Sequence, residues 1–153
     1  MQQAIKFDIE LINRYDKAGP RYTSYPTALE FHDQFNEDDY RRHIMLSNKK
    51  GGPLSLYFHI PFCDTVCFYC ACNKIITKNR QHAVPYLQHM HKEIAVLGAL
   101  FDKERVVDQL HWGGGTPTFL SFQQMKELMD VTRQHFTLRD DDSAEYSIEI
   151  DPR

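Results

Sequence analysis

The chain has 153 residues, enough for one domain with a sizeable core, and its 42% hydrophobic and 25% charged residues are ordinary for a globular protein. The formal net charge of −3 gives no electrostatic reason to expect nucleic-acid binding. No apolar run approaches the ~18 residues of a membrane span, and no signal-peptide core follows Met1. We therefore predict a cytoplasmic protein without a membrane span.

Residues 1–52 are predicted to form a helical and irregular N-terminal segment. Apolar side chains recur at helical spacing before Gly19-Pro20, which ends the helix: Phe7, Leu11, Ile12 and Tyr15. The aromatic arm from Arg21 to Thr27 is either a packing arm or a segment in which Arg21 pairs with a carboxylate. Asn36 is a suitable N-cap for a second helix, whose acidic first turn follows directly.

Residues 53–153 show alternating strand and helix patterns. The expected strands are Leu54–Ile60, Val106–Trp112 and Glu145–Ile150. The expected helices are Val84–Phe101 and Phe122–Phe136, the second with a capping box at Ser121 and Gln124. The order strand, helix, strand, helix, strand predicts an α/β fold with parallel strands and crossover helices.

All cysteines of the chain fall in the loop directly after the first expected strand: Cys63, Cys67, Cys70 and Cys72. The first three have the spacing C-x3-C-x2-C, and three thiolates this close can bind three irons of a [4Fe–4S] cluster and leave the fourth open. Cys72 lies only two residues beyond Cys70, so we expect it near the site without reaching the fourth iron. A structural zinc site, a disulfide pair and cysteines without any ligand are the alternatives.

Gly113–Gly115 follow the second expected strand. Glycine permits positive φ and close approach of a ligand, and three in a row leave backbone N–H and C=O groups for a charged ligand, although a plain turn has the same composition. This run and the cysteine loop both follow parallel strands, where α/β proteins bind ligands. By alternation, Glu149 faces away from Ile148 and Ile150, and its carboxylate needs a ligand or a salt-bridge partner. The histidines show no metal-binding spacing.

The stretch Tyr57–Cys63, the cysteine spacing and the ending Cys70-Ala71-Cys72 resemble the radical S-adenosylmethionine (SAM) enzymes and, among them, the oxygen-independent coproporphyrinogen III oxidase (coproporphyrinogen dehydrogenase) family. The resemblance also takes in Gly19–Thr27, Gly113–Thr118 and Ser147–Arg153. The family's proteins are considerably longer. The resemblance implies that residues 53–153 are the first half of a (β/α)6 partial TIM-type barrel, preceded by the segment 1–52.

The resemblance also implies the chemistry. Cys63, Cys67 and Cys70 would hold the cluster, and its open iron would bind SAM, which is cleaved to a 5′-deoxyadenosyl radical. The reaction is the oxidative decarboxylation of two propionates of coproporphyrinogen III to give protoporphyrinogen IX in anaerobic haem biosynthesis. The family binds two SAM molecules per chain, takes electrons from a donor and is monomeric. The positions that match SAM contacts or flank the cluster are Tyr57, Tyr69, Gly114, Gly115, Thr116 and Glu149.

Two other functions compete with the oxidase. The haem-binding chaperones of the same superfamily share the cysteine triad, but they typically have Cys-Asp-Phe in place of Cys70-Ala71-Cys72 and lack an arm like Arg21–Thr27. A nonenzymatic Fe–S or zinc-binding fragment is favoured only by the chain's length. From that length we expect little or no oxidase activity from this chain alone, although its motifs match an oxidase.

Overall fold

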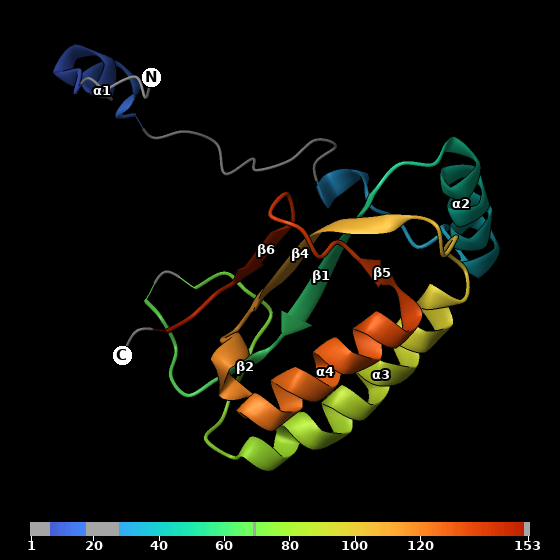
Figure 1. Ribbon diagram of the computed structural model, residues 1–153. Helices are drawn as coiled ribbons and strands as arrows, with labels where there is room; N and C mark the ends of the chain where they lie inside the picture. Colours follow the sequence, from blue (N-terminus) through green and yellow to red (C-terminus); the bar gives the residue numbers. More distant parts are fainter. Residues whose placement is uncertain (1–6, 18–27, 69, 152–153) are drawn as a thin grey trace. The chain divides into compact units, whose positions relative to one another are not determined.

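The computed structural model describes residues 7–17, 28–68 and 70–151, and its contacts divide the chain into two units, residues 1–36 and 37–153 (Figure 1). The first unit contains α1 (Ile9–Tyr15) and the 3-10 helix η1 (Ala28–Glu30). Asp8 caps α1, because its side chain accepts a hydrogen bond from the Leu11 N–H at 3.0 Å. The predicted first helix is therefore confirmed. The arm Arg21–Thr27 lies outside the described residues, and the division at residue 52 stays a prediction.

The second unit begins with α2 (Glu37–Lys50), which starts directly after Asn36 as predicted. Gly51 and Gly52 have φ values of +70° and +91° and form the turn into the sheet. The Arg105 guanidinium fixes this turn, since its Nε donates to the Gly52 carbonyl at 2.9 Å and its Nη1 to Ser47 Oγ at 2.9 Å. The end of α2 is thus held next to the start of the sheet.

A parallel sheet forms the middle of this unit, with β4 (Val106–Gly114) paired to β1 (Leu54–Ile60) on one side and to β6 (Glu145–Ile148) on the other. The short β5 (Thr137–Leu138) also pairs with the start of β4. A second, two-stranded sheet of β2 (Phe62–Cys63) and β3 (Ile75–Ile76) closes the cysteine loop. All these pairs are parallel, which confirms the predicted α/β class.

Two helices, α3 (Ala83–Gly98) and α4 (Phe122–His135), lie side by side on one face of the sheet (Figure 1). Short 3-10 turns precede them, η2 (Arg80–His82) and η3 (Pro117–Phe119). The predicted capping box is present: Ser121 Oγ accepts the Gln124 N–H, and Gln124 Oε1 accepts the Ser121 N–H at 2.9 Å. Among the described helices, none is long and apolar enough to cross a membrane.

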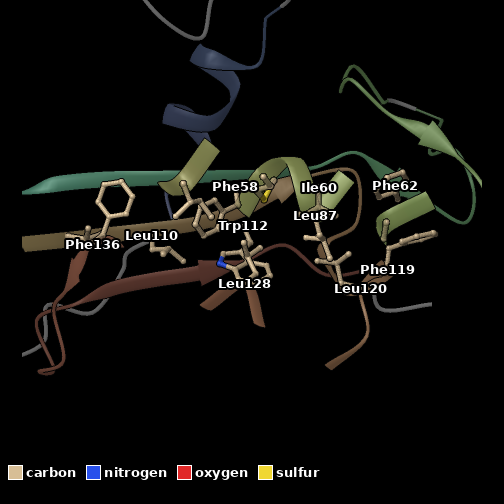
Figure 2. Packing of buried hydrophobic residues seen from close by; sticks show 14 of the residues in the cluster. Phe58, Ile60, Phe62, Leu87, Leu110, Trp112, Phe119, Leu120, Leu128 and Phe136 are labelled. Carbon is tan, nitrogen blue, oxygen red and sulfur yellow. The ribbon is translucent and has the colours of Figure 1, made fainter. Parts of the chain in front are cut away.

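The hydrophobic core lies between the sheet and these two helices (Figure 2). Phe58 of β1 packs edge-on against its register partner Trp112 of β4, with ring centroids 5.6 Å apart, and Leu128 of α4 is fully buried. Because side chains alternate along a strand, Tyr57 and His111, each one position earlier, project from the opposite face. That second face carries the polar side chains described below.

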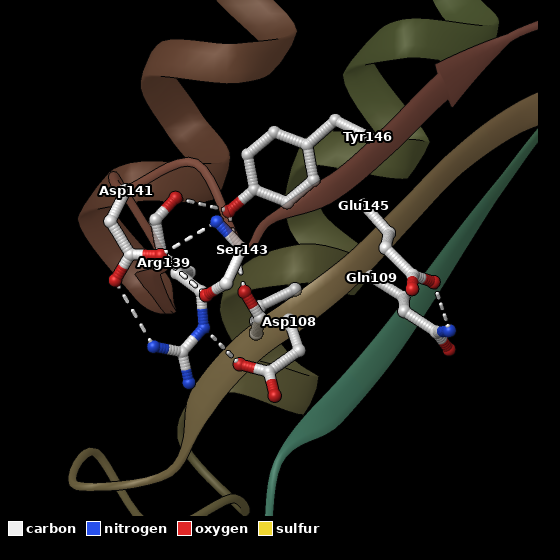
Figure 3. Close-up of polar contacts among 8 residues, drawn as sticks. Asp108, Gln109, Arg139, Asp141, Ser143, Glu145 and Tyr146 are labelled. Carbon is white, nitrogen blue, oxygen red and sulfur yellow. Dashed lines mark hydrogen bonds and ion pairs between the residues drawn. The ribbon is translucent and has the colours of Figure 1, made fainter. Parts of the chain in front are cut away.

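The turn between β5 and β6 is fixed by polar contacts (Figure 3). Arg139 Nε donates to Asp108 Oδ1 at 2.6 Å, and the Tyr146 hydroxyl donates to the Arg139 carbonyl at 2.6 Å. The Ser143 N–H donates to Asp141 Oδ1 at 2.9 Å. These contacts hold the start of β6 beside β4, so that the two strands stay in register up to their carboxyl ends.

Candidate functional site

The cysteine loop is closed at its base by β2 and β3. The Ile75 N–H donates to the Pro61 carbonyl at 2.7 Å, and the Thr77 N–H donates to the Cys63 carbonyl at 2.9 Å. Cys63 is buried at this base, and the remaining cysteines lie farther along the loop, half-buried or exposed. The loop therefore starts from a fixed point at the carboxyl end of β1.

The loop carries thiols, which are metal-binding ligands, but among the described residues they are not arranged around a common point. All four cysteines lie in the described part of the chain, and none of them forms a disulfide there. The Cys70 N–H donates to the Cys67 carbonyl at 3.2 Å, which places these two residues in one turn. No three Cys, His, Asp or Glu side chains of the described residues stand close enough to hold a metal ion. In chemical kind, thiolates are the ligands that an iron–sulfur cluster takes, so the donor set fits such a cluster.

Cys70 and Cys72 differ in acidity. A hydrogen bond with the Cys72 backbone lowers the pKa of the Cys70 thiol, and Lys74 adds to this effect. Burial raises the pKa of Cys72, and the negative charges of Cys70 and Glu149 add to that. The thiolate, which is the form that binds metal, therefore forms more readily at Cys70 than at Cys72.

The glycine run lies against the end of β1. Gly114 has a φ of +108°, as the composition predicted, and a Cβ on Gly115 would lie 2.7–2.8 Å from backbone atoms of Pro61 and Phe62. The Thr116 hydroxyl donates to Cys63 Sγ at 3.7 Å. Glycine is therefore required here because the turn after β4 packs directly on the start of the cysteine loop.

The expectation that the run Gly113–Gly115 leaves its N–H groups for a ligand is wrong for Gly114 and Gly115, and the N–H of the next residue is engaged as well. The Gly114 N–H donates to Glu149 Oε2 at 3.2 Å, and the Gly115 N–H donates to the Ile60 carbonyl at 2.8 Å. The Thr116 N–H donates to the Phe62 carbonyl at 2.8 Å. The Glu149 side chain and the carbonyl groups of β1 and β2 satisfy these donors within the chain.

A row of polar side chains crosses the sheet on the face opposite the helices. Tyr57 of β1, His111 of β4 and Ser147 of β6 are register neighbours. The Tyr57 and His111 rings stack with centroids 5.8 Å apart and planes inclined by 15°, and His111 Nδ1 lies 2.7 Å from Ser147 Oγ. The row therefore links all three long strands near their carboxyl ends.

Glu149 extends this row beyond the end of β6. Its N–H donates to the Trp112 carbonyl at 2.9 Å, so it continues the strand register and faces away from Ile148, as alternation predicts. Its carboxylate lies 3.4 Å from His111 Nε2 and accepts the Gly114 N–H. The partner that this carboxylate was expected to need is therefore present within the chain, although 53% of the side chain remains exposed.

Tyr57 is oriented by His59. His59 Nε2 lies 2.9 Å from the Asn73 carbonyl, which can only accept, so this nitrogen carries the hydrogen. In the neutral ring, His59 Nδ1 is then the acceptor for the Tyr57 hydroxyl at 3.1 Å. Burial raises the pKa of Tyr57, and the charge of Glu149 raises it further, which keeps the phenol in its donating form.

The structure thus gathers most of the predicted site residues at one end of the sheet: Tyr57, Gly114, Gly115, Thr116 and Glu149, beside the cysteine loop. Tyr69 lies outside the described residues. Sequence reasoning missed His59 and His111, because the histidines were considered only as possible metal ligands. The available signal was the alternation within each strand. His59 lies two positions after Tyr57 in β1, and His111 lies two positions before Gly113 in β4, so each pair shares one face of the sheet.

Comparison with known proteins adds the family. A protein from Mannheimia haemolytica named oxygen-independent coproporphyrinogen III oxidase is 47% identical over 148 residues, which cover 97% of this chain and 98% of that relative. The chain belongs to the oxygen-independent coproporphyrinogen III oxidase family. The Pseudomonas aeruginosa member is 54% identical over 153 residues, which cover 100% of this chain and 33% of that protein. The chain spans about a third of the length of the relatives from Pseudomonas aeruginosa, Synechocystis and Escherichia coli. No family model matches it.

A solved structure supports the fold. Coproporphyrinogen III oxidase (HemN) from Escherichia coli, described as a radical SAM enzyme, superposes with a TM-score of 0.78 at 44% identity. The superposition covers 99% of this chain and 32% of that one. The predicted radical SAM fold is therefore confirmed.

Proposed function

We propose that the chain provides the cluster loop and the first SAM-binding strands of a radical SAM oxidoreductase. The reaction is conversion of coproporphyrinogen III to protoporphyrinogen IX by oxidative decarboxylation of two propionates. The observation that carries this proposal is the contact between the Thr116 hydroxyl and the Cys63 thiol, which joins the glycine turn to the cysteine loop. The names of the relatives favour the oxidase over a haem-binding chaperone.

In this proposal Cys63, Cys67 and Cys70 hold a [4Fe–4S] cluster, and Cys72 does not. The opposite pKa shifts of Cys70 and Cys72 support the distinction. When bound, such a cluster supplies the electron for cleavage of SAM. A loop of reduced thiols suits the cytoplasm, where disulfides are rare.

The SAM site in this proposal lies on the polar face beside the loop, at Tyr57, Glu149, Gly114, Gly115 and Thr116, with Tyr69 by resemblance. The N–H groups after β4 are already engaged, so they are poor candidates for ligand recognition. The half-exposed Glu149 carboxylate retains acceptor capacity, which suits an amino group or a ribose hydroxyl. Glu149 is therefore the principal polar contact that we propose for SAM.

The test is anaerobic reconstitution with iron and sulfide. The wild-type chain should gain the absorbance of one [4Fe–4S] cluster, Cys67→Ser should lose it, and Cys72→Ser should keep it. Addition of SAM should change the EPR signal of the reduced cluster. Loss with Cys72→Ser but not with Cys67→Ser would refute the ligand assignment, and an unchanged spectrum at saturating SAM would count against the SAM site.

A turnover assay tests whether the 153-residue chain carries out the oxidase reaction by itself. We expect little or no protoporphyrin from the 153-residue chain with reductant, SAM and coproporphyrinogen III. The reason is that a tetrapyrrole with two SAM molecules needs more enclosing surface than β1, β4 and β6 provide. Multiple turnovers by the purified chain would show that this expectation is wrong.

A further inference from the structure

We propose that His111 is a positioning residue, which holds the Glu149 carboxylate and the Tyr57 ring in the arrangement that receives SAM. The inference rests on the proposed function and assigns a role to a residue outside the predicted site. Its basis is the set of contacts that His111 makes with three other side chains on two neighbouring strands.

In the neutral ring, the hydrogen bonds fix the tautomer of His111. A carboxylate only accepts, so His111 Nε2 carries the hydrogen that points to Glu149 Oε1 at 3.4 Å. His111 Nδ1 is then the acceptor, and the Ser147 hydroxyl donates to it at 2.7 Å. Both ring nitrogens are therefore engaged by β6 and the residue that follows it, while the ring face lies against Tyr57 of β1.

Gly113 shows how closely these groups converge. A Cβ on Gly113 would lie 2.9 Å from His111 Nε2, 3.1 Å from Tyr57 Cε2 and 3.2 Å from Glu149 Cδ. The three side chains thus meet over one glycine and leave no room for another side chain there. A change in the His111 ring is transmitted directly to both neighbours.

Without His111, the described contacts would leave the Glu149 carboxylate one hydrogen bond, from the Gly114 N–H. A half-exposed carboxylate with one fixed oxygen can rotate into solvent, and a ligand must then pay the entropy of ordering it. The neighbouring register pair on the same face, Gln109 and Glu145, forms a hydrogen bond of its own, in which Gln109 Nε2 donates to Glu145 Oε2 at 2.6 Å. Gln109 therefore provides a matched control.

The first measurement is the SAM affinity of the reconstituted protein, monitored through the EPR signal of the reduced cluster. His111→Phe keeps the stacked ring and loses both hydrogen bonds, so it should weaken SAM binding about tenfold. His111→Gln restores an N–H donor near the position of Nε2 and should recover most of the affinity. Gln109→Ala should bind as the wild type does, with equal cluster content in all variants. Wild-type affinity in His111→Phe would overturn the proposal.

The second measurement needs neither cluster nor SAM. Nitrogen NMR of histidine-labelled protein should show His111 as the Nε2–H tautomer, and Glu149→Ala should remove that preference. If the wild type does not bind SAM, the proposed function fails, and this spectrum still decides whether His111 orients Glu149. An Nδ1–H tautomer, or one that Glu149→Ala leaves unchanged, would overturn the inference.

Discussion

Arg80 donates two parallel hydrogen bonds to Asp64, from Nη1 to Oδ1 at 2.6 Å and from Nη2 to Oδ2 at 2.8 Å. The same guanidinium lies 4.0 Å from the centre of the Phe119 ring. The hydrogen bond from Arg80 holds the pKa of Asp64 below its usual range. Because Asp64 follows Cys63 directly, the pair fixes the start of the cysteine loop to η2 and η3.

Loss of this pair should loosen the loop. Arg80→Gln should speed the release of iron from the reconstituted protein to a chelator about two- to fivefold, the range expected for an exposed ion pair. Asp64→Asn should have a similar effect. Arg133→Gln is the control, because that arginine is 60% exposed and lies 3.9 Å from Asp130. Equal release rates in the Arg80 and Arg133 variants would contradict the prediction.

Gly115→Ala should destabilise the protein by about 1–3 kcal/mol, the typical cost of overpacking. The added Cβ would meet backbone atoms of Pro61 and Phe62, which cannot rotate away as a side chain can. Urea unfolding monitored by circular dichroism measures the free-energy change. Thr118→Ala, at an exposed position of the same turn, should be nearly neutral. A stable Gly115→Ala protein would mean that the two loops do not pack as described.

Thr116→Val should lower the reduction potential of the cluster. The Thr116 hydroxyl donates to Cys63 Sγ, and a hydrogen bond to a ligand sulfur stabilises the more negative, reduced state. Valine has the same shape without the donor, while Thr116→Ser keeps it. Redox titration followed by EPR should place the valine variant below the wild type and the serine variant close to it. An unchanged or raised potential in Thr116→Val would argue against this hydrogen bond.

Acid should weaken the turn before β6. Hydrogen bonds from Ser143 lower the pKa of Asp141, and Arg139 contributes further. A carboxylate whose pKa is lowered by folding stabilises the fold at pH values above about 3.9, which is its pKa in the unfolded chain. This stabilisation is lost as the pH falls through the pKa of the carboxylate in the folded protein. The Tm of the wild type should therefore exceed that of Asp141→Asn at pH 7, and the difference should shrink in acid. Asp142→Asn is the neighbouring control, and a difference independent of pH would refute the assignment.

Much of the fold could be predicted from local patterns. The first strand was predicted with the bounds of β1, and the two long helices were found from apolar spacing and a capping box. The second strand was predicted to end at Trp112, but β4 continues to Gly114 because Gly113 and Gly114 pair with residues of β1. That extension depends on a neighbour distant in sequence. The two-residue strands β2, β3 and β5 are too short to show the alternation of apolar and polar residues by which a strand is predicted.

The site could be predicted only where the alternation of side chains within a single strand was sufficient. Alternation along the third strand placed Glu149 on the correct face. The roles of His59 and His111 depend on the register between β1, β4 and β6, which no single strand contains. The engaged N–H groups of Gly114 and Gly115 likewise depend on acceptors distant in sequence, Glu149 and Ile60.

The parallel pairing of β1 with β4 joins residues about fifty positions apart in the chain. Forming such a pair closes a long loop before its contacts compensate the lost chain entropy, so the pairing is slow to form. During synthesis the cysteines leave the ribosome before Gly115 and Thr116 exist to enclose Cys63. Over that interval a thiol that the finished fold buries is open to any metal or oxidant in the cell. We therefore expect the Cys63 thiol to become protected only after β4 and the turn that follows it have been synthesised.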